Sequence, residues 1–309
     1  MHINSLQAPR AVVMIRPHRF HPNPETAADN AFQRTSADGT AADIARLARD
    51  EVTIAAARLT DVGVHVHVFD DHGERQTPDS VFPNNWFSTH PGGHVALYPM
   101  YSPSRRRERR SDIIEMLKSE YRVQDVIDYS GLEYDGVFLE GTGAMVLDHG
   151  ARIAYTAKSN RADPIALERF CTHFNFEPMA FATADRSGHA IYHTNVMMCV
   201  ATEFALVGLD LIADDKRRAE VRARLEETGR TVIALDQQQI TEFAGNALEL
   251  SATEGRVLAM SERAAASLTD AQRQAISRSA QLLPLSVPTI ELAGGSVRCM
   301  LAGIHLSRR

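Results

Sequence analysis

Five segments of the chain share one layout, in which a polar side chain is followed by an apolar, strand-like stretch and a turn. The five leading side chains are separated by 56, 53, 53 and 53 residues along the sequence. A period of about 50 residues is typical of repeated supersecondary units, including those of propeller folds. If the units surround an axis, equivalent strand beginnings meet at its centre and form one pocket. The side chains predicted to meet there are those of Asn84, Glu140, His193, Asn246 and Cys299.

A thiol, an imidazole and a carboxylate in one pocket are suited to covalent catalysis at an electrophilic carbon. A cysteine attacks as the thiolate, which a neighbouring base or positive charge favours, so we expect Cys299 to work with His193. Glu140 would accept N–H groups from a nitrogen-rich substrate or hold a catalytic proton. A purely structural interpretation of each residue stays open, because free cysteine is commonly a small buried hydrophobe. The repeated placement of the three residues favours the catalytic interpretation.

Other chemically capable side chains lack such a pattern. Cys171 lies on a predicted amphipathic helix and Cys199 in a predicted buried strand, so both are expected in the core. His65 and His67 stand on one face of a predicted strand and could bind zinc. No third ligand stands at a persuasive spacing, and the sequence contains no phosphate-binding or dinucleotide-binding motif. We therefore expect neither a metal ion nor a cofactor.

Hydrophobic periodicity and turn residues predict a mixed α/β chain that positions these side chains. Residues 11–16 and 64–70 are predicted strands, and residues 40–63 form a predicted helix that stops at a glycine. No linker or low-complexity tract divides the sequence, so a single domain over residues 1–309 is expected. Further helices are predicted near residues 104–121, 162–175, 214–228 and 262–281.

Composition argues against several classes of protein. The chain has 309 residues and a formal net charge of −6, which disfavours nucleic acid as a partner. Its arginine-rich run, residues 103–112, is interpreted as the solvated first stretch of a helix. Three cysteines are too few for a disulfide framework, and no stretch resembles a signal peptide or a membrane span. We expect a cytoplasmic protein that binds neither nucleic acid nor membrane.

An ordered set of motifs resembles the pentein, or guanidino-group-modifying, superfamily. That group includes arginine deiminases, dimethylarginine dimethylaminohydrolases, succinylarginine dihydrolases and amidinotransferases. The N-terminal stretch, residues 14–33, is most similar to that of the bacterial citrulline-utilisation hydrolases. The resemblance implies an α/β fold, a five-bladed propeller with its catalytic residues near the pseudo-fivefold axis. The motifs that carry it are "FPNNWFSTH" (82–90), "FLEGTGAMVLD" (138–148), "SNRAD" (159–163), "HTNVMM" (193–198) and "GGSVRCM" (294–300).

The resemblance also implies roles for individual residues. Cys299 matches the nucleophile of the family, His193 the general acid/base and Glu140 its carboxylate partner. Asn84 matches a substrate-contacting asparagine at the pocket entrance, and Arg161 matches a residue near the carboxylate end of the substrate. Further candidate substrate contacts are Asn195, Asn246 and His90.

Three departures from the deiminase pattern bear on the substrate. Gly143 stands where deiminases carry a second acidic residue, Asn195 stands in place of an aspartate, and His90 stands in place of another. A guanidinium is best held by several carboxylates, whereas an amide both donates and accepts hydrogen bonds. A neutral ureido group, with N–H donors and a carbonyl oxygen, suits such amides better. These departures favour citrulline over arginine as the small amino-acid substrate, with ornithine, ammonia and carbon dioxide as products.

Alternatives stay open at this point. The chain could be a deiminase or dihydrolase for arginine or a derivative, although succinylarginine dihydrolases also lack some of these acids. An amidinotransferase would pass the carbon to a second amine, and a non-catalytic pentein would use the fold only as a binding surface, as a ribosome anti-association factor does. Residues 17–30 are a candidate mobile entrance loop, and a homo-oligomer is possible.

Overall fold

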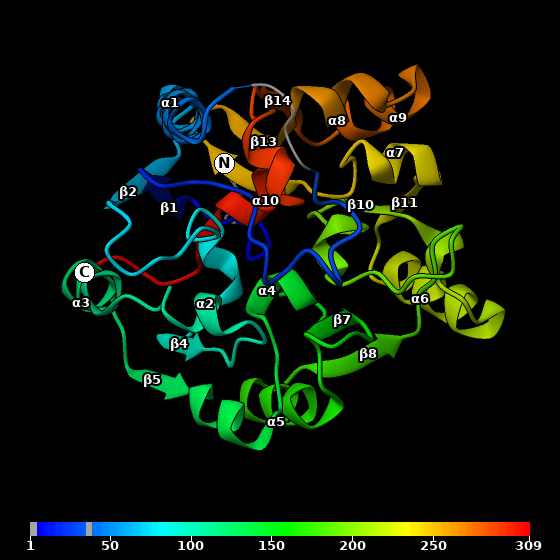
Figure 1. Cartoon of the computed structure of the whole chain (residues 1–309). Coiled ribbons are helices and arrows are strands. Elements are labelled where there is room, and N and C mark those ends of the chain that lie inside the picture. Colours follow the sequence, from blue (N-terminus) through cyan, green and yellow to red (C-terminus); the bar gives the residue numbers. More distant parts are fainter. Residues whose placement is uncertain (1–4, 35–38) are drawn as a thin grey trace.

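Five small sheets surround a common centre (Figure 1). The computed structural model describes residues 5–34 and 39–309, and each sheet that these residues form has three strands. This arrangement confirms the predicted α/β five-bladed propeller, because each sheet serves as one blade. The sheets have the strand orders β15-β1-β2, β3-β4-β5, β6-β7-β8, β9-β10-β11 and β12-β13-β14.

One blade shows the connection that four of the five blades use. Strands β3 (Phe87–His90) and β4 (His94–Leu97) pair antiparallel across a short turn, and β5 (Asp125–Asp128) pairs parallel to β4. A parallel pair needs a crossover that leaves the sheet and returns to it. Helices α2 (Pro103–Arg106) and α3 (Ser111–Glu120) supply that crossover.

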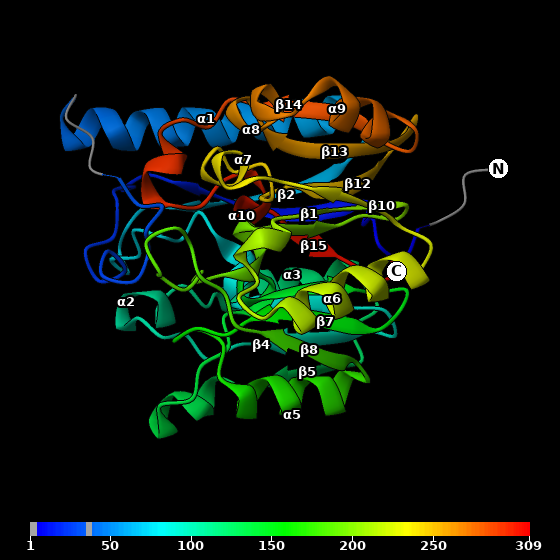
Figure 2. The ribbon, with the colours of Figure 1, turned by 90° about the vertical axis from the view of Figure 1, so that its right-hand side faces the viewer.

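The next three blades follow the same plan, with helices on the outside of the ring (Figure 2). The first of these blades contains β6 (Met145–Asp148), β7 (Ile153–Ala157), α5 (Pro164–Phe174) and β8 (Glu177–Phe181). The second contains β9 (Met198–Val200), β10 (Phe204–Val207), α6 (Asp215–Glu227) and β11 (Thr231–Ala234), and is followed by α7 (Gln237–Thr241). The third contains β12 (Leu248–Ala252), β13 (Gly255–Ser261), α8 (Glu262–Ser267), α9 (Asp270–Ser277) and β14 (Gln281–Leu285).

The fifth blade joins the two ends of the described chain. Strand β1 (Ala11–Pro17) pairs antiparallel with β15 (Ala302–Ile304) and parallel with β2 (His65–Asp71). Helix α1 (Ala41–Asp61) provides the crossover from β1 to β2. Because β15 follows Cys299 directly in the chain, the closure of this blade also determines where that thiol lies.

Short helical turns precede the first strand of four blades and face the centre of the ring. They are η1 (Pro83–Asn85), α4 (Gly141–Ala144), η3 (Thr194–Val196) and α10 (Val297–Met300). Helix α4 contacts η1 and η3, and α10 contacts η1, so turns that are far apart in sequence meet at the axis. The predicted convergence of strand beginnings is therefore observed.

Two local predictions differ from the structure. The helix predicted near 104–121 is two helices, α2 and α3, because Arg110 adopts an extended conformation between them. The helix predicted near 262–281 is also divided, since the Thr269 side chain caps a new helix by accepting from the Gln272 backbone N–H. Cys299 lies in the helical turn α10, ahead of the strand that starts at Ala302.

The outer helices cover the blades with one apolar face each. On α5, the buried side chains of Phe170 and Phe174 pack with Leu139 and Met145 of the same blade. Across residues 5–34 and 39–309, no helix combines the length and the apolar character that crossing a membrane requires.

A buried ion pair joins two neighbouring blades and generates a stability prediction. Arg230 donates to Asp148 at 2.5 and 3.0 Å, and both side chains are at most 5% exposed. Asp148→Asn leaves a buried guanidinium without its counter-charge, so we expect the free energy of unfolding to fall by about 3–5 kcal/mol. Urea denaturation followed by circular dichroism measures this loss.

The matched control is Glu226→Gln on the surface of α6. Glu226 pairs with Arg222 at 3.6 Å, and both side chains are about half exposed. This substitution is expected to change the free energy of unfolding by less than about 1 kcal/mol. Equal losses in the two variants would contradict the role given to the buried pair.

Candidate active site

A small enclosed pocket lies where the axial turns meet. Its volume is about 10 Å³, which is room for one water molecule. Side chains from several blades line it, and the loop after β1 covers it with Thr26 and Asn30. The lining side chains with chemical potential are those of Cys299, His193, Arg161, Arg105, Asn85 and Asp79.

The sulfur of Cys299 is surrounded by amide donors. Asn195 Nδ2 and Asn246 Nδ2 lie 3.3 and 3.2 Å from Cys299 Sγ, and both donate to it. Asn246 is held in turn because its Oδ1 accepts from the Arg298 backbone N–H at 3.0 Å. The two asparagines therefore fix the position of the sulfur from two other blades.

His193 and Glu140 form a hydrogen bond beside the thiol. Each residue directly precedes a helical turn, η3 for His193 and α4 for Glu140, and His193 Nε2 lies 2.8 Å from Glu140 Oε2. Burial lowers the pKa of His193 to about 4, although the hydrogen bond to Glu140 acts in the opposite direction. The imidazole is therefore neutral at pH 7 and able to accept a proton.

The carboxylate of Glu140 is fully buried and has several partners. Burial alone favours its protonated form, but Arg161, His193 and Arg105 outweigh burial and hold the pKa of Glu140 well below its usual range. The Nη1 atoms of Arg105 and Arg161 lie 3.4 and 3.5 Å from Glu140 Oε2. Its other oxygen, Oε1, accepts from the Tyr101 backbone N–H at 3.0 Å. Glu140 is thus an ionised acceptor for His193.

Arg105 is a pocket residue that the sequence analysis missed. The run 103–112 is not uniformly solvated, because Arg105 is only 2% exposed and its guanidinium lines the pocket. Its Nε and Nη2 donate to the two oxygens of Glu108 at 2.9 and 3.0 Å, and Asp79 Oδ2 lies 3.8 Å from Nε. The available signal was the opposite charge of Glu108, three residues after Arg105.

Burial raises the pKa of Asp79 and raises that of Glu108 to about 8, against the opposing attraction of Arg105. Whether these two acids are neutral or paired with Arg105, neither presents an uncompensated negative charge to the pocket.

Arg161 also lines the pocket and forms hydrogen bonds to the loop that covers it. Arg161 Nε and Nη2 donate to Asp29 at 3.0 and 2.5 Å, and its guanidinium lies 4.9 Å from the centre of the Tyr192 ring. Asn30, next to Asp29, donates to the Ala293 carbonyl at 3.0 Å. The predicted entrance loop therefore packs over the pocket through Asp29 and Asn30.

The asparagine that lines the pocket is Asn85, next to Asn84, which the sequence analysis predicted as a substrate contact. Asn84 is fully buried beside the pocket, and its carbonyl accepts from Thr142 Oγ1 at 3.1 Å, but its side chain does not line the cavity. Asn85 does line it. In the amide orientation that satisfies both neighbours, Asn85 accepts from Arg105 at 2.9 and 3.0 Å and donates to Asn84 Oδ1.

His90 lies elsewhere, so the structure corrects its placement among the substrate contacts. Its side chain is buried in β3, where Nε2 lies 2.7 Å from Ser88 Oγ and the ring packs 4.3 Å from that of Phe174. Burial holds the pKa of His90 well below its usual value. The ring belongs to the core of a blade, because side chains alternate between the two faces of a strand.

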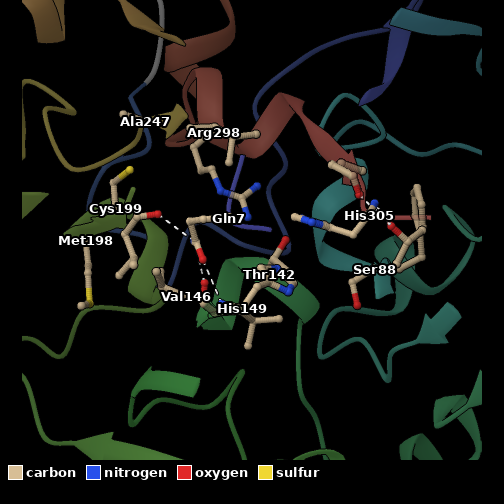
Figure 3. A pocket seen from close by; sticks show the side chains of 17 residues that line it. Gln7, Ser88, Thr142, Val146, His149, Met198, Cys199, Ala247, Arg298 and His305 are labelled. Atoms are coloured by element: carbon tan, nitrogen blue, oxygen red, sulfur yellow. Dashed lines mark hydrogen bonds between the residues drawn. The ribbon is translucent and has the colours of Figure 1, made fainter. Parts of the chain in front are cut away.

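A second cavity is lined by Arg298 (Figure 3). Its volume is about 40 Å³, and its lining includes Arg298, Cys199, His149 and His305 but not Cys299. Arg298 and Cys299 are adjacent in the chain, yet their side chains line different cavities. The buried Cys199 faces away from the catalytic pocket, and burial raises its pKa to about 12.

Comparisons with known proteins agree with this geometry. No curated protein sequence matches the chain. The N-terminal domain of ArgZ bound to substrate, "an arginine dihydrolase from the Ornithine-Ammonia Cycle in Cyanobacteria", has a TM-score of 0.72 and 14% identity, covering 95% of this chain and 97% of that domain. Unliganded AgrE has a TM-score of 0.71 and 16% identity, covering 95% of this chain but only 39% of the longer AgrE chain.

The dimethylarginine hydrolase DDAH from Pseudomonas aeruginosa, solved as a complex with citrulline, has a TM-score of 0.61 and 13% identity, covering 98% of this chain and all of that one. At identities this low, the structural similarity shows that the pentein fold is shared and nothing more. A family model described as "N,N dimethylarginine dimethylhydrolase, eukaryotic" matches residues 16–306, which is nearly the whole chain. The chain therefore belongs to the N,N-dimethylarginine dimethylhydrolase family of penteins and is a hydrolase of carbon–nitrogen bonds other than peptide bonds.

Proposed function

We propose that the chain hydrolyses the ureido group of citrulline, as the bacterial citrulline-utilisation hydrolases do, through a covalent intermediate on Cys299. One observation carries the choice of substrate: each carboxylate in or beside the pocket already has an internal arginine as its partner. Arg105 forms ion pairs with Glu108, Asp79 and Glu140, while Arg161 forms ion pairs with Asp29 and Glu140. No carboxylate among the described pocket residues is left to hold an incoming guanidinium.

A neutral head group fits the remaining partners. The amides of Asn195 and Asn246 contact the thiol, and Asn85 lines the same pocket as the thiol. The side-chain oxygen of Asn195 has no hydrogen-bond partner. A ureido N–H would satisfy that oxygen, while a ureido carbonyl accepts from an amide or a guanidinium N–H. A guanidinium would instead bring a third positive charge next to Arg105 and Arg161.

The other end of the substrate is assigned to Arg161. A guanidinium binds a carboxylate through two parallel hydrogen bonds, which Asp29 occupies in this structure. The α-carboxylate of citrulline would replace or share that partner. A cavity of about 10 Å³ cannot admit an amino acid, so residues 17–30 must move away before substrate enters. We propose that this loop is the lid of the pocket.

The chemistry follows from the neutral imidazole. His193 accepts the Cys299 proton as sulfur bonds to the ureido carbon, and then delivers that proton to the departing nitrogen, so that ammonia leaves. The ornithine part stays attached to sulfur as a thiocarbamate. His193 then takes a proton from water, whose oxygen bonds to the carbon as the carbon–sulfur bond breaks and the thiol is restored. The released carbamate decomposes to ornithine and carbon dioxide, and Glu140 orients His193 throughout.

The first prediction separates substrate classes and tests the nucleophile. Purified enzyme is incubated in parallel with citrulline, arginine, succinylarginine and dimethylarginine, and amine products are identified by mass spectrometry. We expect the enzyme to produce ornithine from citrulline. The Cys299→Ala variant should produce none, because it lacks the attacking sulfur atom, although its side chain is nearly as large. Cys171→Ala, which alters a buried thiol outside the pocket, is the matched control and should retain activity.

Arginine turnover with no reaction on citrulline would overturn the substrate proposal and favour a dihydrolase like ArgZ. An active Cys299→Ala enzyme would overturn the covalent mechanism. Formation of a new guanidino product when glycine or ornithine is added would identify an amidinotransferase. Absence of any reaction, with no labelling of Cys299 by a haloacetamidine, would favour the non-catalytic binding module.

The second prediction concerns pH. Protonation of His193 removes the base, so kcat/KM should fall as the pH decreases through about 4, the pKa of His193. Glu140→Gln removes an interaction that raises this pKa, so the acid limb should move to still lower pH while kcat falls by at least about 100-fold. Circular dichroism at each pH confirms that the enzyme stays folded, and an acid limb near pH 6.5 would contradict the burial of a neutral His193.

The third prediction explains why an acidic residue is absent at position 143. A Cβ on Gly143 would overlap the amide of Asn85 and lie 2.9 Å from the His193 ring. Gly143→Ala should therefore displace His193 and lower kcat by about 10- to 100-fold, with a smaller effect on KM. Gly131→Ala, whose Cβ would meet nothing within 4 Å, is the control. Steady-state kinetics on citrulline measure both, and unchanged kcat in Gly143→Ala would show that the contact does not position the base.

A further inference from the structure

Two histidines and a glutamate converge on the outer side of the fifth blade, away from the thiol. His65 and His67 lie two residues apart on the edge strand β2, so both side chains emerge on one face. Their ring centres are 4.4 Å apart. Glu120, the last residue of α3, comes from the neighbouring blade and supplies the third ligand that no sequence spacing indicated.

The donor atoms of the three side chains point to one place. One nitrogen of each histidine and one oxygen of Glu120 all lie within 4.8 Å of one another, and His67 Nε2 is 3.9 Å from Glu120 Oε2. Among residues 5–34 and 39–309 this is the single group of three potential ligands gathered so closely. Tetrahedral zinc, with bonds of about 2.0–2.1 Å, needs ligand atoms about 3.3 Å apart, so small rotations of these side chains would complete the site.

A cation already occupies this place. Arg308 Nη2 lies 2.8 Å from His65 Nε2 and 3.7 Å from Glu120 Oε2. His65 Nε2 is therefore an acceptor, which is the form of imidazole that binds metals. The Arg308 side chain is 58% exposed, so its guanidinium can turn away into solvent.

We propose that His65, His67 and Glu120 form a binding site for a divalent transition metal ion such as Zn²⁺, for which Arg308 competes. Two imidazoles and one carboxylate are a ligand set that zinc accepts, with a solvent molecule completing the tetrahedron.

One existing hydrogen bond has to change. The Tyr121 hydroxyl lies 2.7 Å from His67 Nε2, the atom that would face the metal. On metal binding, Tyr121 would release His67 and donate to Glu120 or to the metal-bound water, as outer partners of metal sites commonly do. The bound ion would link β2 to the end of α3, and thereby hold two adjacent blades together. An ion that binds only the folded state raises its thermal stability.

The test uses the full chain, stripped with EDTA and titrated with ZnCl₂ by calorimetry. We expect one equivalent to bind to this site and the melting temperature to rise with zinc concentration. Glu120→Gln and His67→Ala should each weaken binding by at least about tenfold and remove the thermal shift. Glu120 is an exposed residue, so its variant also serves if His67→Ala folds poorly.

Arg308→Ala provides the sharpest discrimination. Removal of the competing guanidinium should tighten zinc binding, whereas a site in which Arg308 plays only a structural role would not gain affinity. His94→Ala is the matched control, because His94 is a partly exposed histidine outside this cluster, with its Nδ1 2.7 Å from Asp125 Oδ1. Its zinc affinity should equal that of the wild type.

Cobalt(II) identifies the ligands, since the catalytic Cys299 could itself capture a soft metal. Coordination by nitrogen and oxygen gives visible absorption without the near-ultraviolet band of a thiolate ligand. Visible bands that persist in Cys299→Ala and disappear in Glu120→Gln support the proposal. Equal zinc affinity in wild type and Glu120→Gln, weaker binding in Arg308→Ala, or a cobalt spectrum that shows thiolate alone would each overturn it, whatever the enzyme does with citrulline.

Discussion

The centre of this molecule depends on one fully buried carboxylate. Glu140 accepts from His193 and lies within 3.5 Å of the guanidinium groups of Arg105 and Arg161. A buried carboxylate is costly unless it is paired and hydrogen-bonded, and each of these partners comes from a different part of the ring. Satisfying Glu140 therefore requires that several blades be assembled in register. The same interaction fixes the orientation of the imidazole, so stability and chemistry share a single set of contacts.

The closure of the ring explains why these groups can be far apart in sequence. Cys299 is carried by the turn before β15, and β15 is held by pairing with β1 at the other end of the chain. Asn195 and Asn246, from two further blades, then reach its sulfur. No single blade supplies the thiol, the imidazole and the carboxylate together. The pocket exists because equivalent turns in the repeat face the same axis, which makes catalytic geometry a property of the whole ring.

The features of the fold and the pocket that could be predicted from the sequence are those that recur in each repeat. The polar residues at strand beginnings recur at a fixed period, so the convergence of Glu140, His193 and Cys299 was predictable, as was the five-bladed fold. Arg105 was not, because a guanidinium in an arginine-rich run becomes buried only when acids from other segments surround it, and Asp79 is distant in sequence. His90 was misplaced because period does not say which face of a strand a side chain occupies. Glu120 joins His65 and His67 through tertiary packing alone.

The internal arginines are also the basis for proposing a neutral head group in a pocket rich in acids. Asp29, Asp79, Glu108 and Glu140 each have Arg105 or Arg161 as a partner, and burial raises the pKa of Asp79 and Glu108, which lessens the negative charge of these two acids. A guanidinium substrate would have to displace one of these internal cations and leave it buried without a full set of partners, which is unfavourable. A ureido group avoids that exchange and needs only hydrogen bonds. Specificity in this pocket is therefore set as much by which charges are already satisfied as by which residues touch the substrate.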